Sequence, residues 1–365
     1  MEILLLLGAA FLAFSNGAND NFKGFATVWG SETLSYRRAL TLATIATVLG
    51  SAVSIVFADT LVQQFSGKGL VPNDIAGSPG FILSVGIGAA STVMIATRMG
   101  LPISTTHALI GGLVGAGLMQ GTRIVNFGKL VSTFLMPLLV SPFLAATLGY
   151  VAYRLMRLRR TENDCACIVA TEATVQISDI GTASYHRMGP PRVVIDSDAQ
   201  CNRITTTVVR VSISAWQDRL HTLSAAAICF ARGVNDTPKL VALLLAARLF
   251  NAQVSAMVIA IVMALGGLLL SRRVAQTMSQ RMTSMDHTQG LAANLISATL
   301  ILFASKFGLP VSTTHISVGS IAGTGASART LDWATLRNIL LSWVATLPLA
   351  GLIAAAAAAL LSSGA

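Results

Sequence analysis

The octapeptide "GLPISTTH" at Gly100–His107 recurs as "GLPVSTTH" at Gly308–His315, with seven of eight positions identical. A second motif recurs with it, because "FSNGANDNFK" at Phe14–Lys23 matches "FARGVNDTPK" at Phe230–Lys239. The copies lie 208 residues apart for the first motif and 216 apart for the second. Because these separations are so similar, we interpret the chain as two duplicated halves. Each half carries an N-D-x-x-K motif followed by an S-T-T-H motif.

The composition is that of an integral membrane protein. Of the 365 residues, 53% are hydrophobic and 11% are charged, and the mean hydropathy is +0.70, whereas soluble proteins carry about 25% charged residues. A bilayer core of about 30 Å takes roughly 20 helical residues. Uncharged runs of that length could each cross the bilayer once, and they include Ala39–Ala58, Met99–Thr122, Leu130–Tyr153, Leu249–Ser271 and Asn338–Ala365. They are continuously apolar rather than alternating, which indicates an all-α polytopic membrane protein.

The pattern divides the chain into three segments. Residues 1–153 form a first transmembrane repeat, 154–219 a cytoplasmic linker or small module, and 220–365 a second transmembrane repeat. The linker has no apolar run of spanning length and opens with four arginines in seven residues, "RLMRLRR". It holds three of the four cysteines, and the lone C-x-C among them is a weak metal signal. We expect free thiols rather than a disulfide framework, because cytoplasmic disulfides are rare. The cysteines are Cys165, Cys167, Cys201 and Cys229.

The basic residues predict an orientation, because lysine and arginine are enriched in cytoplasmic loops. This rule also explains the net charge of +10 without a nucleic-acid partner. If each half crosses five times, the second half is inverted relative to the first, both termini are outside and the linker is cytoplasmic. The basic residues then inside are Arg37, Arg38, Arg98, Arg272, Arg273, Arg281, Arg329 and Arg337, and those outside are Lys68, Arg123, Lys129, Arg248 and Lys306. Inverted repeats with interrupted helices around a mid-membrane site are typical of secondary transporters.

The N-D-x-x-K motif places charges at membrane depth in both halves. Asn19, Asp20 and Lys23 follow one apolar run, and Asn235, Asp236 and Lys239 follow another. Charged groups in such a place mark ion or substrate pathways, although an ion pair that only fixes packing is the alternative. The glycine ahead of each motif, Gly17 or Gly233, can break the helix and leave backbone groups free.

The S-T-T-H motif predicts a helix start. Proline cannot extend a helix backwards, and the serine that follows is a strong N-cap residue. A helix N-terminus presents unpaired N–H groups and the positive end of the dipole, which attract an anion. Neutral hydroxyls that can donate to an oxyanion surround it in both halves: Ser104, Thr105, Thr106, Ser312, Thr313 and Thr314.

Four further residues have two readings each. His107 and His315 either relay protons or anchor their own backbone and neighbouring hydroxyls. Arg98 and Lys306, just ahead of the motifs, either attract an anion or mark where a span ends.

These motifs resemble the inorganic phosphate transporter (PiT) family of membrane symporters, which also includes sulfate permeases. The resemblance rests on "NGAND" and "GVND", each followed by GLP-[IV]-STTH, and covers essentially everything except 154–219. It implies two inverted repeats, sodium- or proton-coupled phosphate uptake by alternating access, and a homodimer in the plasma (inner) membrane. The substrate-binding residues that it implies are Asn19, Asp20, Ser104, Thr105, Thr106, Asn235, Asp236, Ser312, Thr313 and Thr314.

The chain departs from the family pattern in one respect. Many members have a run like N-D-x-x-N where this chain has Lys23 and Lys239, which formally neutralise Asp20 and Asp236. A fixed ammonium can replace a bound cation, so we expect Lys23 and Lys239 to compensate charge or take part in coupling. We expect the same of His107 and His315. The alternative of sodium ions held by Asn19, Asp20, Asn235 and Asp236 stays open, as does proton coupling; no other cofactor is expected.

Three alternatives to phosphate transport remain at this point. Sulfate is a tetrahedral dianion like monohydrogen phosphate but lacks the proton that a carboxylate would accept, so the two aspartates favour phosphate. A channel fits less well than a carrier, because paired charged motifs at mid-membrane suit a binding site. An intramembrane enzyme is disfavoured by the duplication, since acid and base need two different roles rather than two matching sets.

Overall fold

The computed structural model describes residues 1–57, 69–121, 125–158, 165–169, 172–175, 185–188, 190–204, 207–246 and 250–363. Four expected spans have one end outside these ranges, at Ala58, Thr122, Leu249 or Ala365. The basic residues Lys68, Arg123 and Arg248, which were expected on the outer side, also lie outside the described residues.

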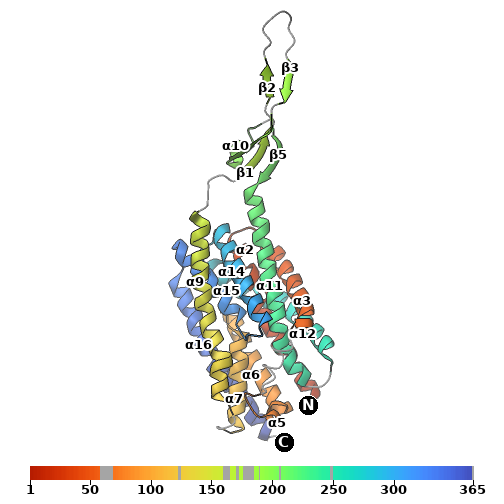
Figure 1. Ribbon diagram of the computed structural model, residues 1–365. Coiled ribbons are helices and arrows are strands. Elements are labelled where there is room, and N and C mark those ends of the chain that lie inside the picture. The colour runs from red at the N-terminus through yellow and green to blue at the C-terminus, as the bar shows by residue number, and fades with distance from the viewer. Residues whose placement is uncertain are drawn as a thin grey trace, which may run out of the picture. The chain divides into compact units, whose positions relative to one another are not determined.

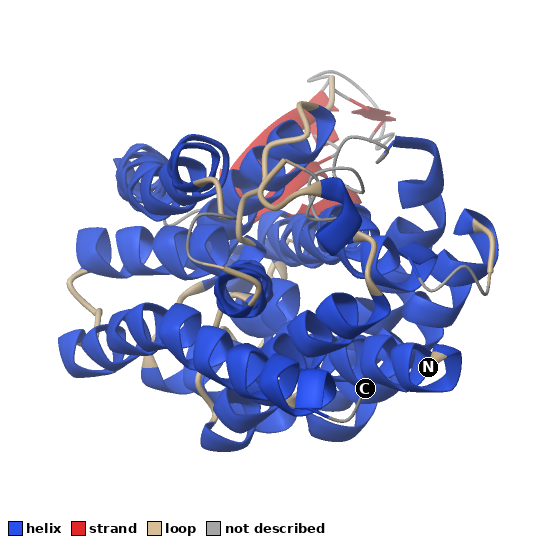
Figure 2. Cartoon of the chain, turned by 90° about the horizontal axis from the view of Figure 1, so that it is seen from below, coloured by secondary structure: helices blue, strands red, loops and turns tan. Residues whose placement is uncertain are grey.

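The chain divides into two compact units, one of Met1–Leu155 with His221–Ala365 and a smaller one of Met156–Leu220. The larger unit is a bundle of helices (Figure 1; blue in Figure 2). The helical segments that form it or extend into it are α1 (Glu2–Asp20), η1 (Lys23–Phe25), α2 (Ala26–Gly30), α3 (Tyr36–Phe57), α5 (Asn73–Ala76), α6 (Pro79–Met99), α7 (Thr105–Met119), α8 (Phe127–Lys129), η2 (Leu130–Leu135), α9 (Met136–Leu158), α11 (Ile213–Ala246), α12 (Ala252–Leu270), α13 (Arg272–Gln276), η3 (Thr277–Arg281), α14 (His287–Lys306), α15 (Thr313–Ala328) and α16 (Trp333–Ser363).

The bundle has the surface of a membrane protein. Among the described residues, six helical stretches are long and apolar enough to cross a bilayer: Glu2–Gly30, Pro79–Met99, Phe127–Arg157, Ala252–Leu270, His287–Lys306 and Trp333–Ser362. Large apolar side chains point away from the bundle, with Phe143 72% exposed, Val344 75% and Leu352 70%. The expected all-α polytopic membrane fold is therefore confirmed. The number of crossings in each half and the inversion of the second half stay predictions.

The two GLP-[IV]-STTH motifs interrupt helices. α6 ends at Gly100, whose φ of 73° is left-handed, and the Leu101 amide then donates back to the Ala96 carbonyl at 2.9 Å. Gly308, with φ of 64°, follows α14 in the same way. Glycine adopts this conformation without the penalty that a Cβ would bring. The chain then runs without helix through the proline before α7 or α15 begins.

The run Met99–Thr122 is consequently not one transmembrane helix, and that prediction was wrong. α7 covers 15 residues of it, which gives a length of about 22 Å at 1.5 Å per residue, short of the ~30 Å bilayer core. The run is uncharged throughout, but Gly100 and Pro102 inside it end one helix and delay the next.

The prediction that Gly17 and Gly233 break their helices was also wrong. Both residues lie inside regular helix, in α1 and α11. A Cβ on Gly17 would lie 1.9 Å from the Met263 carbonyl oxygen of α12, and a Cβ on Gly233 would lie 2.3 Å from the Thr47 carbonyl oxygen of α3. The two glycines therefore allow helices to pack backbone against backbone, which is the usual role of small residues in membrane bundles.

The smaller unit contains the strands. β1 (Cys165–Val169) pairs antiparallel with both β4 (Arg192–Asp196) and β5 (Thr207–Ser212), giving the order β4-β1-β5. A hairpin of β2 (Glu172–Val175) and β3 (Tyr185–Met188) and the short helix α10 (Asp198–Cys201) complete it. Cys165 and Cys201 form a disulfide and Cys167 is free, so the expectation of free thiols fails for two of these three cysteines. The antiparallel fold brings together residues that are 36 positions apart.

Candidate functional site

The four motif copies meet in the interior of the helical bundle. The first N-D-x-x-K motif lies at the end of α1 and the second within α11, while the S-T-T-H motifs start α7 and α15. The charged members are almost fully buried, with Asp20 1% exposed, Asp236 4%, Lys23 3% and Lys239 2%. Burying charges is costly unless each finds partners, and the contacts of the two lysines supply them.

Lys23 lies in a group of four oxygen atoms. Its ammonium donates to Asn19 Oδ1 at 2.9 Å, to the Ile103 carbonyl at 3.0 Å, to an Asp20 carboxylate oxygen and to the Thr314 hydroxyl. Asn19 is fixed in turn, because its Nδ2 donates to Thr97 Oγ1 at 2.9 Å. A carboxylate, a carboxamide, a carbonyl and a hydroxyl thus surround one positive charge.

Lys239 has the matching environment in the other half. Its ammonium donates to Asp236 Oδ1 at 3.2 Å, to the Val311 carbonyl at 3.1 Å and to Thr106 Oγ1 at 3.1 Å. Asn235 donates to the same Asp236 oxygen at 3.2 Å.

Each of the two lysines contacts residues of both halves of the chain. Each lysine bonds the carbonyl before the S-T-T-H serine of its own half and the last threonine of the opposite half. Thr314 completes the crossing, because its hydroxyl donates at 2.8 Å to the same Ile103 carbonyl that Lys23 contacts. The two motif pairs therefore form a single site rather than two separate ones.

Arg232 is the residue that the motif analysis missed. It is 1% exposed, and its guanidinium donates to Asn16 Oδ1 at 3.0 Å while its Nε lies 3.5 Å from Asp236 Oδ2. Asn16 also donates to Asp20 Oδ2 at 3.2 Å. A guanidinium thus links the two carboxylates of the two halves through one asparagine.

The sequence did contain a signal for this link. Arg232 occupies the position in "FARGVNDTPK" that Asn16 occupies in "FSNGANDNFK", directly before the shared glycine. An unmatched arginine within an otherwise apolar helical run is a candidate functional residue.

The charges of the site do not cancel. Three basic side chains, Lys23, Lys239 and Arg232, face two carboxylates, Asp20 and Asp236. One positive charge is left in excess among the described residues of the site, which favours an anion in a low-dielectric interior.

The helix N-termini add to this preference. Ser104 and Ser312 are the predicted N-caps, and each accepts from the backbone amide of the histidine three residues on, at 3.1 and 3.2 Å. Thr105 Oγ1 donates to Asp20 Oδ2 at 3.2 Å, and Thr313 lies buried at the matching position of α15. The positive ends of two helix dipoles thus lie beside the lysines.

The two histidines contact each other, and His315 also contacts α9 and α16. The rings of His107 and His315 meet edge to face with centroids 4.5 Å apart, and His315 stacks on Trp343 at 3.9 Å. His315 Nδ1 lies 3.1 Å from the Leu138 carbonyl of α9. Because a carbonyl oxygen only accepts, this nitrogen carries the proton. These contacts favour the anchoring role for His315 over a relay.

Arg98 and Lys306 lie outside the site. Both are exposed and stand in the last turns of α6 and α14. A cation there stabilises the negative end of the helix dipole. Of the two expected roles, the end of a helix is the one that the structure supports.

Comparisons with known proteins identify the family of the chain. Residues 16–354 match the model of a family described as "Phosphate transporter family". A candidate phosphate permease of Pyrococcus abyssi is 28% identical over 393 residues, which cover 97% of this chain and 96% of that protein. A Bacillus subtilis protein named "Probable low-affinity inorganic phosphate transporter" is 26% identical over 360 residues, covering 98% and 96%.

A solved structure supports the fold. The protein named "The sodium-dependent phosphate transporter" superposes with a TM-score of 0.76 at 21% identity and covers 99% of each chain. The family match includes both copies of both motifs. The resemblance seen in the motifs is thereby confirmed, and the intramembrane enzyme is excluded because the family consists of transporters. The chain belongs to the phosphate transporter family.

Proposed function

We propose that this chain is a secondary transporter that carries inorganic phosphate by alternating access through the site built from the two motif pairs. The observation that carries the proposal is the excess positive charge of Lys23, Lys239 and Arg232 over Asp20 and Asp236 at two helix N-termini. The charged side chains are at most 4% exposed. Such burial is what an occluded state between outward and inward opening requires.

Asp236 supports phosphate over sulfate as the substrate. Among the described residues, no group donates a hydrogen bond to its Oδ2 atom, which keeps only the ion-pair distance of 3.5 Å to Arg232 Nε. A buried acceptor of this kind can take the proton of monohydrogen phosphate, whereas sulfate has no proton to donate. A site with an unpaired acceptor rejects the ligand that lacks the matching donor.

The lysines support transport without sodium. The Lys23 ammonium contacts four oxygens of the types that coordinate Na⁺ in transporters. The Lys239 ammonium contacts three at matching positions, a carboxylate, a carbonyl and a hydroxyl. The tethered ammonium groups supply the positive charge that a bound cation would bring. The coupling ion that this leaves is the proton.

The orientation expected from the arginines belongs to the same proposal. The smaller unit, Met156–Leu220, would face the cytoplasm, and both termini would lie outside. Labelling of single introduced cysteines from either side of sealed vesicles tests this placement. The homodimer implied by the resemblance stays a prediction.

Uptake of labelled phosphate into proteoliposomes tests the function. We expect a pH gradient to drive uptake in sodium-free buffer, unlabelled sulfate to compete poorly, and Asp236→Asn to abolish the uptake. Uptake that needs a sodium gradient would contradict the role of the lysines. Equal competition by sulfate would contradict the role of Asp236.

A further inference from the structure

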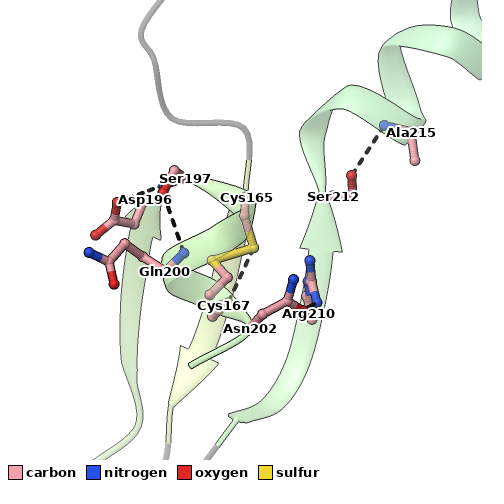
Figure 3. Close-up of a disulfide and its surroundings, with 10 residues drawn as sticks. Cys165, Cys167, Asp196, Ser197, Gln200, Asn202, Arg210, Ser212 and Ala215 are labelled. Carbon is pink, nitrogen blue, oxygen red and sulfur yellow. Dashed lines mark hydrogen bonds between the residues drawn. A yellow bond between two sulfur atoms is a disulfide. The ribbon is translucent and has the colours of Figure 1, made fainter. Parts of the chain in front are cut away.

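The smaller unit gathers three sulfur atoms in one place. Side chains alternate between the two faces of a strand, so Cys165 and Cys167, two residues apart on β1, share a face of the β4-β1-β5 sheet. Cys201, the last residue of α10, forms a disulfide with Cys165. Figure 3 shows this disulfide as a yellow bond at Cys165, with Cys167 beside it.

The third cysteine is part of the same cluster. Cys167 is free, and its Sγ lies 3.3 Å from the Sγ of Cys165. All three sulfur atoms lie within 4.8 Å of one another. Cys165 and Cys167 are 0% exposed and Cys201 is 2% exposed. A structural disulfide accounts for two of these residues and gives no reason for the third to lie against it.

We propose that the reduced forms of Cys165, Cys167 and Cys201 bind a single thiophilic metal ion of the zinc or copper(I) class. Thiolate sulfur selects such soft ions over hard cations. Three sulfurs at the usual zinc–sulfur distance of about 2.3 Å stand about 4 Å apart around the ion. The cluster is close enough for this, since its members already lie within 4.8 Å of one another.

The sheet carries a basic residue that could balance the negative charge of such a centre. Three thiolates and a divalent ion carry one net negative charge. Arg210 of β5 is the register partner of Cys167 and therefore projects from the same face. Its guanidinium donates to Asn202, which follows Cys201 in the sequence (Figure 3), so an exposed cation is bonded to the residue next to one of the three cysteines.

The disulfide and the metal centre are alternative states of the same cysteines. Two thiols of a low-molecular-weight reductant convert the Cys165–Cys201 disulfide to two cysteine thiols and form their own disulfide. Binding of the ion then releases three protons, one from each thiol. Three protein ligands leave a fourth position for water. In a reducing compartment such a cysteine cluster is better suited to a metal than to a disulfide.

Metal analysis of the full-length protein in detergent tests the proposal. The protein is reduced with a phosphine, loaded with Zn²⁺ and freed of excess ion, and its zinc content is measured by mass spectrometry. We expect stoichiometric zinc, and with Co²⁺ as the probe a sulfur-to-cobalt charge-transfer band in the near ultraviolet. Cys167→Ser should lose most of the metal and the band. Cys229→Ser, a buried cysteine of the helical bundle, is the matched control and should keep both.

Two results would overturn the inference. One is reduced protein that retains no more zinc than Cys165→Ser/Cys201→Ser. The other is full retention of zinc by Cys167→Ser, since the third cysteine would then have no part in the site. Thiol titration of each variant before and after reduction shows that the cysteines were accessible to the reductant, so that a negative result counts against the proposal.

Discussion

Arg232 donates to Asn16 across 3.0 Å, and these two residues occupy the same position in the two copies of the repeated motif. One half thus contributes a fixed cation and the other a neutral amide at equivalent places. Asp236 lies 3.5 Å from the Arg232 Nε atom, and Asp20 accepts from Asn16. The duplicated site is therefore asymmetric in charge although its lysines and threonines match.

Replacement of Arg232 tests whether this excess charge binds the anion. We expect Arg232→Gln to weaken phosphate uptake, with KM raised about tenfold or more, because a buried charged hydrogen bond contributes about 1.5–3 kcal/mol and 1.4 kcal/mol is about a factor of ten. Arg98→Gln, at the exposed end of α6, is the control and should leave KM unchanged. An unaltered KM in a folded, monodisperse Arg232→Gln protein would contradict the role.

Replacement of both lysines tests whether they stand in for sodium. Lys23→Asn with Lys239→Asn removes two ammonium groups and takes one hydrogen-bond donor away from each of their oxygen partners. We expect the double variant to lose uptake in sodium-free buffer and to recover part of it when sodium is added. Lys306→Asn, exposed at the end of α14, is the matched control. If the double variant responds to sodium as the unsubstituted protein does, the lysines are not cation substitutes.

Replacement of Gly17 tests whether this glycine is needed for the close packing of α1 against α12. Gly17→Ala puts a methyl group 1.9 Å from the Met263 carbonyl oxygen. We expect a loss of stability of about 1–3 kcal/mol, the usual cost of overpacking, seen as a lower unfolding temperature in detergent. Gly80→Ala is the control because its Cβ would meet no atom within 4 Å. Equal unfolding temperatures for the two variants would show that α1 and α12 can separate without cost.

Replacement of the histidines distinguishes an anchoring role from a proton-relay role. His315→Phe keeps the stacking on Trp343 and removes the hydrogen bond to Leu138. We expect a lower uptake rate with the midpoint of its pH dependence unchanged, since an anchor positions α15 and moves no proton. His107→Phe should behave alike. A shift in the midpoint of the pH dependence of uptake in either variant would support the proton-relay role instead.

Much of this site follows from the sequence because the motifs are duplicated. The repeats identified the four segments that meet, and the serine N-caps are where the proline and serine place them. The crossing of Lys23 to Thr314 and of Lys239 to Thr106 was not predictable, because motif spacing within one half says nothing of contacts between halves.

Two local errors have a common cause. Hydropathy treats glycine as neutral, but Gly100 ends a helix through its left-handed conformation while Gly17 lies inside one and permits close approach. The sequence alone does not distinguish these two uses. Arg232 could not be found from the residues that the two copies share, because the difference in charge lies at a position where the copies differ.

The most direct test of the account is calorimetric titration of the purified protein with phosphate in sodium-free buffer. The account predicts saturable phosphate binding without sodium, because the lysine ammonium groups already supply the positive charge. It also predicts that Asp236→Asn loses this binding and that sulfate binds little, because Asp236 Oδ2 accepts no hydrogen bond within the described site and can accept the proton of phosphate. Phosphate binding that appears only when sodium is added, or that persists unchanged in Asp236→Asn, would contradict it.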